Sequence, residues 1–311
     1  MGAHGGIGTT DSPGWDAIDA ELARHYPQQS PRHYGALLSP ALGGNDPLYG
    51  ISAYWRDLPQ PHWHFVTYGF SELYDKEGDD PEISGWGFEL TFRLAAAPGS
   101  EPPNWALNFL QNLARYVFGS GNPFEHGHYL NANGPIAADS DSLIRAVAFV
   151  RDPELATLQT PNGRVEFLQV VGLTDDEELA IKRWSTVDVL EALVERMPLW
   201  ITSLERGSLL ADPSVAAAID AGAARDGSQT GFLFVEHLDW TLQPPQGELV
   251  IGANQVASLL GLLPGRLPFG QDLRLIGSDR QVRLAPAAVS ALEDVDGVLE
   301  CRLDAPALAA L

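Results

Sequence analysis

Hydrophobic and polar residues alternate through the stretch GWGFELTFRL, residues 85–94, and this alternation predicts a β-strand. One face of the predicted strand is apolar and carries Trp86, Phe88, Leu90, Phe92 and Leu94. The opposite face carries Gly87, Glu89, Thr91 and Arg93. A period of two with one apolar face is typical of a half-buried sheet, so we expect this strand to anchor a core on one side only.

Further strands follow from the same kind of pattern. Residues 62–68 form the second clear strand, and a hairpin with a long connection is its simplest pairing with residues 85–94. Residues 143–150 and 165–171 predict two more, with a turn at Thr160–Gly163 between them. The chain therefore contains a sheet of at least four strands.

Helical spacing appears between these strands. Ser12 and Pro13 open an amphipathic helix, and the stripe of Trp105, Phe109, Leu113 and Val117 predicts a helix over residues 104–118 that packs on the sheet. Thr174 and Glu177 form a capping box that begins another helix, and Asp212 followed by Pro213 begins one more. These patterns predict helices interspersed with the strands.

The composition of the chain changes near residue 240, where short Leu and Val runs broken by Gly and Pro replace the aromatic-rich pattern. We expect a disordered tail at residues 1–11, a larger domain at residues 12–240 and a smaller C-terminal domain at residues 241–311. A length of 311 residues fits two such units.

Charge limits the choice of partner, because 41 acidic residues face 19 basic ones and leave a formal net charge of −22. Such a field repels phosphate backbones, so we expect no nucleic-acid partner. Acidity can serve solubility alone, or it can attract basic partners. The composition leaves both open.

A single cysteine, Cys301, excludes an intramolecular disulfide and a thiolate zinc cluster. The N-terminal residues lack the pattern of a signal peptide, and no run approaches the ~20 apolar residues that a membrane span needs. We therefore expect a cytoplasmic protein with no membrane partner.

Histidine pairs are the main candidate for chemistry. His62 and His64 share one face of a strand, and His126 and His128 repeat the spacing in a loop. Four imidazoles near carboxylates suit zinc or iron, so a metal-dependent enzyme is the alternative function. The chain has no HExxH signature, and hydrogen-bonded structural imidazoles are the favoured interpretation.

Other catalytic signatures are missing from the sequence. The stretch GFSEL at residues 69–73 lacks the second glycine of a nucleophile elbow, and the glycine clusters at residues 5–8 and 119–121 lack the ending of a phosphate-binding loop. The acidic loop at residues 75–84 lacks the ligand spacing of a calcium loop. We expect no cofactor and no enzymatic activity.

Several stretches of the chain resemble the Suppressor of fused family. They are LGGNDPL, HWHFVTYGFSELY, SGWGFELTFRL, LARYVF, TPNGRVEFLQVVGLT and DGSQTG, spread between Trp15 and about Trp240. The resemblance implies the α+β fold class, with a mixed sheet and packed helices joined to a smaller β-rich C-terminal domain. It also implies a cleft between the domains that, in animal members, takes a short extended peptide of the Gli transcription factors by strand addition.

The resemblance also implies candidate partner-binding residues. Tyr116 matches the family's peptide-contacting tyrosine, whereas His128 stands where the family has a contacting aspartate and Asn133 where it has a contacting histidine. Loss of that carboxylate removes a charge-assisted bond of ~1.5–3 kcal/mol to a peptide histidine. For Tyr116, an ordinary position at the core edge is equally compatible with the sequence.

Bacterial relatives are associated with polymorphic-toxin systems, in which they are thought to act as immunity proteins. A strongly acidic, non-catalytic domain suits that role, because an acidic surface attracts and covers a basic toxin. The sequence therefore favours a protein-binding module of the Suppressor of fused family whose partner is a protein or an extended peptide, with a basic toxin as one case.

Overall fold

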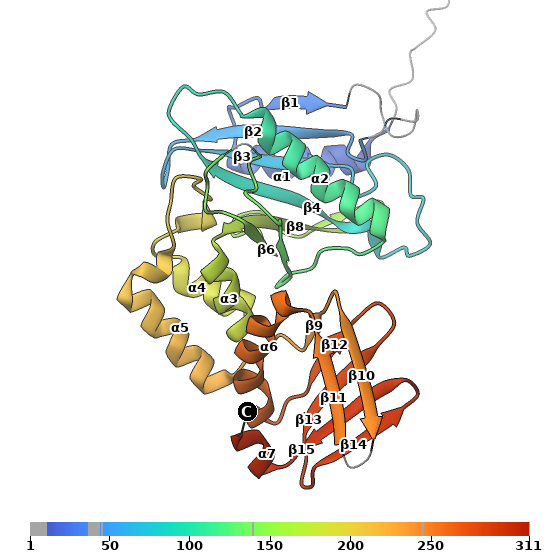
Figure 1. The fold of residues 1–311 in the computed structure, drawn as a ribbon. Coiled ribbons are helices and arrows are strands. Elements are labelled where there is room, and N and C mark those ends of the chain that lie inside the picture. Colours follow the sequence, from blue (N-terminus) through green and yellow to red (C-terminus); the bar gives the residue numbers. More distant parts are fainter. Residues whose placement is uncertain (1–10, 37–43, 45, 139, 244–245, 311) are drawn as a thin grey trace, which may run out of the picture. The chain divides into compact units, whose positions relative to one another are not determined.

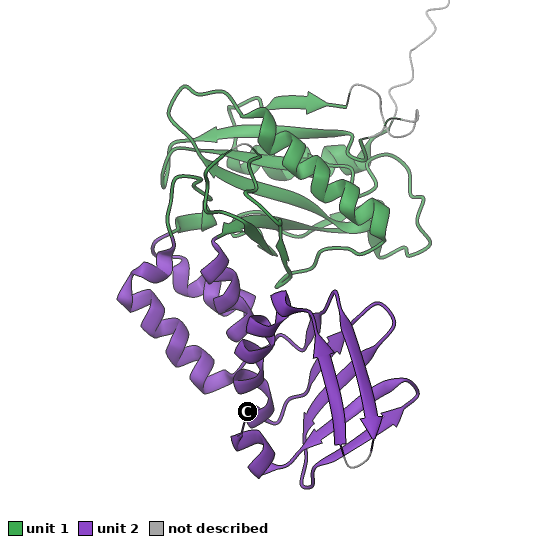
Figure 2. Ribbon diagram, viewed as in Figure 1, with its two compact units in different colours: residues 1–173, 197–207 green, residues 174–196, 208–311 purple. Residues whose placement is uncertain are grey.

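The computed structural model describes residues 11–36, 44, 46–138, 140–243 and 246–310. The chain divides into two compact units, one made of residues 1–173 and 197–207 and the other of residues 174–196 and 208–311 (Figure 2). Apart from Asp11, the tail expected at residues 1–11 lies outside the described residues. The domain boundary expected near residue 240 stays a prediction.

The first unit is a large sheet with one helix on each face (Figure 1). Its helices are α1 (Pro13–His25), α2 (Asn104–Ser120) and the short 3-10 helix η2 (Pro198–Trp200). Its strands are β1 (Arg32–Gly35), β2 (Gly50–Arg56), β3 (His62–Tyr68), β4 (Ile83–Ala95), β5 (Tyr129–Asn131), β6 (Ala146–Arg151), β7 (Leu158–Thr160) and β8 (Gly163–Leu173). They lie in the order β1-β2-β3-β4-β8-β6-β5, with β7 paired to β8 off this path.

The strands predicted from the sequence are present, some with shifted bounds. The strand expected at residues 143–150 is β6, Ala146–Arg151, and the one expected at residues 165–171 lies within β8. The short strand β7 was not predicted. Strand β3 has the expected bounds, β4 contains the expected residues 85–94, and the two pair antiparallel as a hairpin with a long connection. Strands β7 and β8 meet at the expected turn, where Thr160 pairs with Gly163. Strands β4 and β8 pair in parallel.

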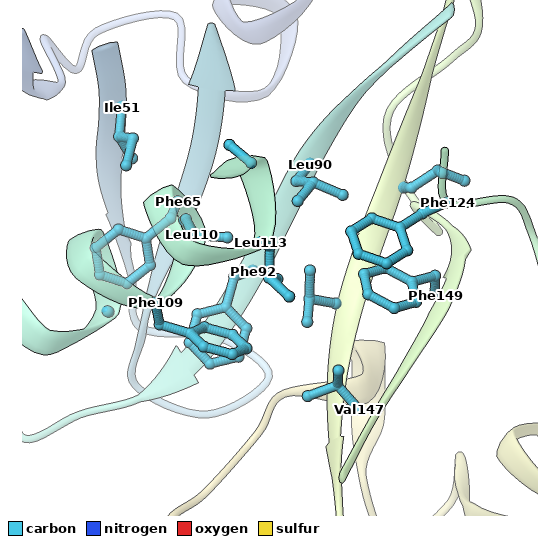
Figure 3. Close-up of a cluster of buried hydrophobic side chains, with 14 of the residues drawn as sticks. Ile51, Phe65, Leu90, Phe92, Phe109, Leu110, Leu113, Phe124, Val147 and Phe149 are labelled. Carbon is cyan, nitrogen blue, oxygen red and sulfur yellow. The ribbon is translucent and has the colours of Figure 1, made fainter. Parts of the chain in front are cut away.

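One face of the sheet is apolar and lies under α2. The alternating residues of β4 point toward α2, whose Leu110 and Leu113 contact them in a cluster that extends to Phe124 and Phe149 (Figure 3). Gly121 caps the C-terminal end of α2, with φ 75° in the left-handed conformation that glycine tolerates best. The expected amphipathic helix is confirmed, with an end two residues later than the pattern predicted.

The opposite face of β4 corrects an expectation. Glu89, Thr91 and Arg93 are all fully buried, so the sheet is not half-buried as its alternation suggested. Helix α1 and the segment around Leu155 cover this face together with Tyr54, Val66 and Tyr68. The polar residues of β4 therefore form interior contacts.

The second unit combines helices with two small sheets. Its helices are α3 (Asp175–Arg183), α4 (Thr186–Leu193), α5 (Pro213–Asp226), α6 (Ala253–Arg266), α7 (Ala305–Ala309), η3 (Leu209–Ala211) and η4 (Leu267–Phe269). Its strands are β9 (Phe232–Phe234), β10 (Leu238–Gln243), β11 (Gln246–Ile251), β12 (Leu273–Ile276), β13 (Gln281–Pro286), β14 (Ala291–Val295) and β15 (Val298–Leu303). Strands β10 and β11 form a hairpin, and the other five lie in the order β14-β15-β13-β12-β9.

Helix starts in this unit follow the caps predicted from the sequence. The capping box of Thr174 and Glu177 is confirmed at the start of α3, where the Glu177 carboxylate accepts from the Thr174 backbone N–H at 3.0 Å. Asp212 caps α5 by accepting from the backbone N–H of Ser214 at 2.8 Å. Helix α4 ends at Leu193, although the apolar pattern continues to Met197. The α+β class with a β-rich C-terminal part is confirmed.

Candidate protein-binding edges

Strand β5 lies at one end of the sheet order of the first unit and pairs antiparallel with β6. Tyr116 of α2 is 42% exposed and stacks on Phe124 with ring centroids 5.5 Å apart. Phe124 in turn stacks on Phe149 of β6 at 3.8 Å (Figure 3). A continuous aromatic stack thus fixes the exposed Tyr116 ring next to the β5 end of the sheet.

The two other candidate residues flank β5. His128 directly precedes the strand, and its Nδ1 accepts from the backbone N–H of Glu125 at 3.2 Å. Asn133 lies two residues beyond the strand, with a positive φ of 55°, and its backbone N–H donates to Oδ1 of Asn131 at 2.8 Å. Both side chains are exposed. The fold therefore brings Tyr116, His128 and Asn133 to one edge of one sheet.

Strand β9 is the corresponding edge in the second unit. Among the described residues it pairs only with β12, in parallel. Phe232 and Phe234 are 54% and 67% exposed, with ring centroids 5.4 Å apart, whereas Leu233 between them packs against the core of the unit. An edge strand therefore carries two aromatic rings that are each more than half exposed, and exposed apolar edges of this kind often mark binding sites.

The sequence analysis missed β9. Its signal is only three residues long. The short apolar run Phe-Leu-Phe after the turn-forming stretch DGSQTG is the feature that could have indicated it. Strand β12, which pairs with it, begins at Leu273, so the pairing has no local sequence signal.

The structure separates the two histidine pairs. His62 and His64 lie on β3, and Nδ1 of His126 accepts from the backbone N–H of Arg151 at the end of β6. Strands β4 and β8 lie between β3 and β6. Three strand spacings are about 14 Å, which is too far for one shared ion. No group of three or more His, Cys, Asp or Glu that could hold a metal occurs among the described residues.

The imidazoles of β3 have structural partners. Nδ1 of His62 donates to the carbonyl of Gln60 at 2.7 Å, and Nδ1 of His64 shares a 2.7 Å hydrogen bond with the Tyr26 hydroxyl. Burial lowers the pKa of both histidines to about 4, so both are neutral near pH 7. These contacts support the interpretation of structural imidazoles.

Comparison with known proteins identifies the family. A family model described as Suppressor of fused protein matches residues 44–207. The mouse Suppressor of fused homolog is 35% identical over 284 aligned residues, which cover 85% of this chain and 57% of the mouse protein. The chain belongs to the Suppressor of fused family. It spans little more than half the length of the mouse relative.

Solved Suppressor of fused structures share the fold of this chain. The crystal structure of Drosophila Suppressor of Fused superposes with a TM-score of 0.81 at 23% identity, covering 96% of this chain and 89% of that one. The structure of the Sufu-Fu complex gives a TM-score of 0.62 at 32% identity, covering 67% of this chain and 98% of that one. The match to the Drosophila protein extends the shared fold over both units.

The buried face of β4 gives this Suppressor of fused chain an interior ion pair. Nη1 and Nη2 of Arg93 donate to the two carboxylate oxygens of Asp152 at 2.6 and 3.0 Å. Both side chains are fully buried. Burial alone would raise the pKa of Asp152, but the Arg93 guanidinium holds it well below its usual range. This bidentate pair joins β4 to the segment that follows β6.

The ion pair is the centre of a larger network. Glu154 accepts from Nη2 of Arg93 at 3.0 Å and from Nη1 of Arg56 at 2.7 and 2.8 Å. Thr91 donates to Asp152 at 2.7 Å. The network thus connects β2, β4 and the segment after β6. It contributes to the fold, and its partners are too far apart along the chain to be paired from local sequence patterns.

Glu89 is a second buried carboxylate on β4. It accepts from the backbone N–H groups of Gly69 and Ser71, each at 2.9 Å, and from the Ser71 hydroxyl at 2.6 Å. Thr67 donates to its other oxygen at 2.7 Å. Burial nevertheless raises the pKa of Glu89 to about 7. The stretch GFSEL at residues 69–73, which lacks the second glycine of a nucleophile elbow, is thus a turn held by the buried Glu89 carboxyl group.

No helix in the described part of the chain is both long enough and apolar enough to cross a bilayer.

Proposed function

We propose that this chain is a non-catalytic protein-binding module that takes an extended segment of its partner by strand addition. The observation that carries the proposal is β9, an edge strand with Phe232 and Phe234 exposed on one side. An added strand bonds to the edge through its backbone, and neighbouring aromatic side chains supply apolar contact area. The family is consistent with this role, because the Sufu-Fu complex is a complex between proteins.

Tyr116, His128 and Asn133 are the proposed partner contacts in the first unit. All three are exposed beside β5, and the stack of Tyr116 on Phe124 holds the tyrosine ring in place before binding. A fixed aromatic ring loses little conformational entropy on binding, which is why such rings often dominate binding energy.

The partner in this proposal is basic. A net charge of −22 attracts a cationic protein and accelerates its association, most strongly at low salt. We further propose the role of an immunity protein in the bacterial cytosol, where the partner is a basic toxin. The charge and the predicted absence of catalysis support that role.

The binding proposal is tested with a partner captured from the native cell at low salt and then purified. Its affinity is measured for the wild-type chain, for the double variant Phe232→Ser/Phe234→Ser and for Val289→Ser. Val289 is 73% exposed in the same unit and away from β9, so it is the matched control. We expect the double variant to weaken binding at least tenfold. A tenfold change in Kd corresponds to about 1.4 kcal/mol, and a single buried aromatic anchor typically contributes more than that.

If Val289→Ser lost as much affinity for the partner as the double variant, the effect would come from general surface hydrophobicity. That result would contradict the role of β9. The toxin role has a separate test, in which the protein encoded by the neighbouring gene is expressed with and without this chain. Growth should be arrested by that protein and restored by the wild-type chain. A neighbouring protein that is harmless in every cell tested would exclude the immunity role while leaving the binding result intact.

A further inference from the structure

The sequence contains two Asn-Gly pairs, Asn133–Gly134 and Asn162–Gly163. In such a pair the backbone nitrogen of the glycine can attack the side-chain amide carbon of the asparagine. Glycine permits this attack because it has no side chain to hinder its nitrogen and many backbone conformations to adopt. The two pairs have the same local chemistry, so any difference between them comes from the fold.

Asn133 is exposed to solvent on the segment that follows β5. Its hydrogen bond to Asn131 uses the backbone N–H, and its side-chain amide takes no part in that bond. Around Gly134 the space is open, since an added Cβ atom would have no heavy atom within 4 Å outside Gly134 and its two chain neighbours. The segment therefore has room for the amide carbon and the glycine nitrogen to approach each other.

Asn162 lies in the opposite environment. Its side chain is 4% exposed, and its amide nitrogen donates to the carbonyls of Glu72 at 3.0 Å and Tyr74 at 2.9 Å. The following Gly163 pairs with Thr160 in the β7–β8 hairpin, and a Cβ atom there would lie 2.7 Å from the Ile83 carbonyl carbon. Two hydrogen bonds and a close backbone thus hold this amide away from reaction.

We propose that Asn133–Gly134 is a site of spontaneous deamidation in the folded protein. The Gly134 nitrogen loses its proton and forms a bond to the Asn133 amide carbon, while the bond from that carbon to its amide nitrogen breaks and ammonia leaves with the proton. The product is a five-membered succinimide. Water then adds to either ring carbonyl and opens the ring to an aspartyl or an isoaspartyl residue at position 133.

The product changes the surface next to β5. A neutral amide becomes a carboxylate two residues beyond the strand, and the isoaspartyl form also adds a methylene group to the main chain. The fold therefore directs an age-dependent charge to the candidate binding edge in the first unit, and protects the other Asn-Gly pair from the same reaction.

The test follows both positions in the intact folded chain at mildly alkaline pH, using peptide mapping with mass spectrometry that separates asparaginyl, aspartyl and isoaspartyl forms. We expect position 133 to convert at least tenfold faster than position 162, about the factor that 1.4 kcal/mol of local protection gives. In concentrated urea the two rates should become similar, because the protection at position 162 comes from the fold.

Two variants complete the test. Gly134→Ala should slow the conversion at position 133 strongly, because a methyl group hinders the attacking nitrogen. If that variant does not fold, Asn133→Gln gives the same information, since its ring would need one more atom and forms slowly. Equal rates at the two positions in the folded chain, or conversion at position 133 only after urea treatment, would overturn the proposal.

Discussion

The two faces of β4 show two different ways of filling an interior. On the α2 side, Leu90 and Phe92 are fully buried among other apolar side chains. On the α1 side, Glu89 and Arg93 are buried to the same extent but depend on hydrogen bonds, Glu89 with Ser71 and Arg93 with Asp152. An apolar face requires only complementary shape, whereas a buried ionisable group also needs hydrogen bonds or a counter-ion.

This contrast teaches where the chain tolerates change. Loss of an apolar side chain leaves a cavity, and the cost depends on how far the surroundings collapse. Loss of one partner from a buried ion pair leaves a charge without compensation. The two faces should therefore respond to substitution with different pH dependence as well as different magnitude.

The largest effect is expected for Arg93→Met. The variant leaves Asp152 buried without its counter-ion, and we expect a loss of about 3–5 kcal/mol in the free energy of unfolding at pH 7. Urea denaturation followed by circular dichroism measures that loss.

The pH dependence of the Arg93→Met variant follows from the depressed pKa of Asp152. In the wild type this carboxylate stabilises the fold above its ordinary pKa of 3.8, and the contribution is lost as the pH falls through the lower folded value. In the variant, burial alone raises the pKa, so protonation relieves the bare charge and the deficit should shrink toward acid pH. A deficit below ~1 kcal/mol at pH 7 would contradict the importance of this pair.

Leu90→Ala probes the apolar face of the same strand, β4. Leu90 is fully buried in the cluster beneath α2, and we expect a loss of about 3 kcal/mol from the cavity and the lost apolar contacts. The same denaturation series from pH 4.5 to 8 should show a constant deficit, because no titrating group is removed. A deficit that varies with pH as strongly as that of Arg93→Met would remove the distinction between the faces.

Glu89→Gln isolates a charge that lies on the polar face without a cationic partner in its contacts. Because burial raises the folded pKa of Glu89 from 4.5 to about 7, its contribution is fully present below pH 4.5 and is lost as the pH rises through 7. The glutamine cannot titrate, so the variant should lose less stability between pH 5 and 8 than the wild type does.

Between pH 5 and 8, the free energy of unfolding should fall by about 2–3 kcal/mol more in the wild type than in Glu89→Gln, taking ~1.4 kcal/mol for each unit of pKa. Thr67→Val, which removes one of the four donors to Glu89 but keeps the carboxyl group, is the matched control and should retain the slope. Parallel stability curves for the wild type and Glu89→Gln would show that Glu89 titrates normally.

Short-range sequence patterns predicted many of the helices and strands of the fold. The alternation in residues 85–94 gave the strand and both of its faces, and the pair Thr174 and Glu177 gave a helix start, because each signal lies within a few residues. The pattern did not show what covers the polar face. Arg93 and Asp152 are 59 residues apart, and nothing in the spacing of either residue indicates the other.

The candidate site was predictable only in part. The family resemblance indicated Tyr116, His128 and Asn133, which the fold places around β5. Their role in binding stays a prediction. Strand β9 could not be found, because an apolar run of three residues is too short a signal and its partner strand lies far along the chain. His62 and His64 do share a face, but burial makes them structural.

The smallest effect is expected for Arg115→Met, which completes the comparison of charge environments. Arg115 pairs with Asp46, and both side chains are more than 40% exposed. Water solvates either charge when its partner is lost, so we expect a change below ~1 kcal/mol that disappears in high salt. The same substitution type at Arg93 and Arg115 differs chiefly in burial. Similar losses at the two positions would mean that removal of the arginine stem, and not desolvation of the remaining carboxylate, causes the effect at Arg93.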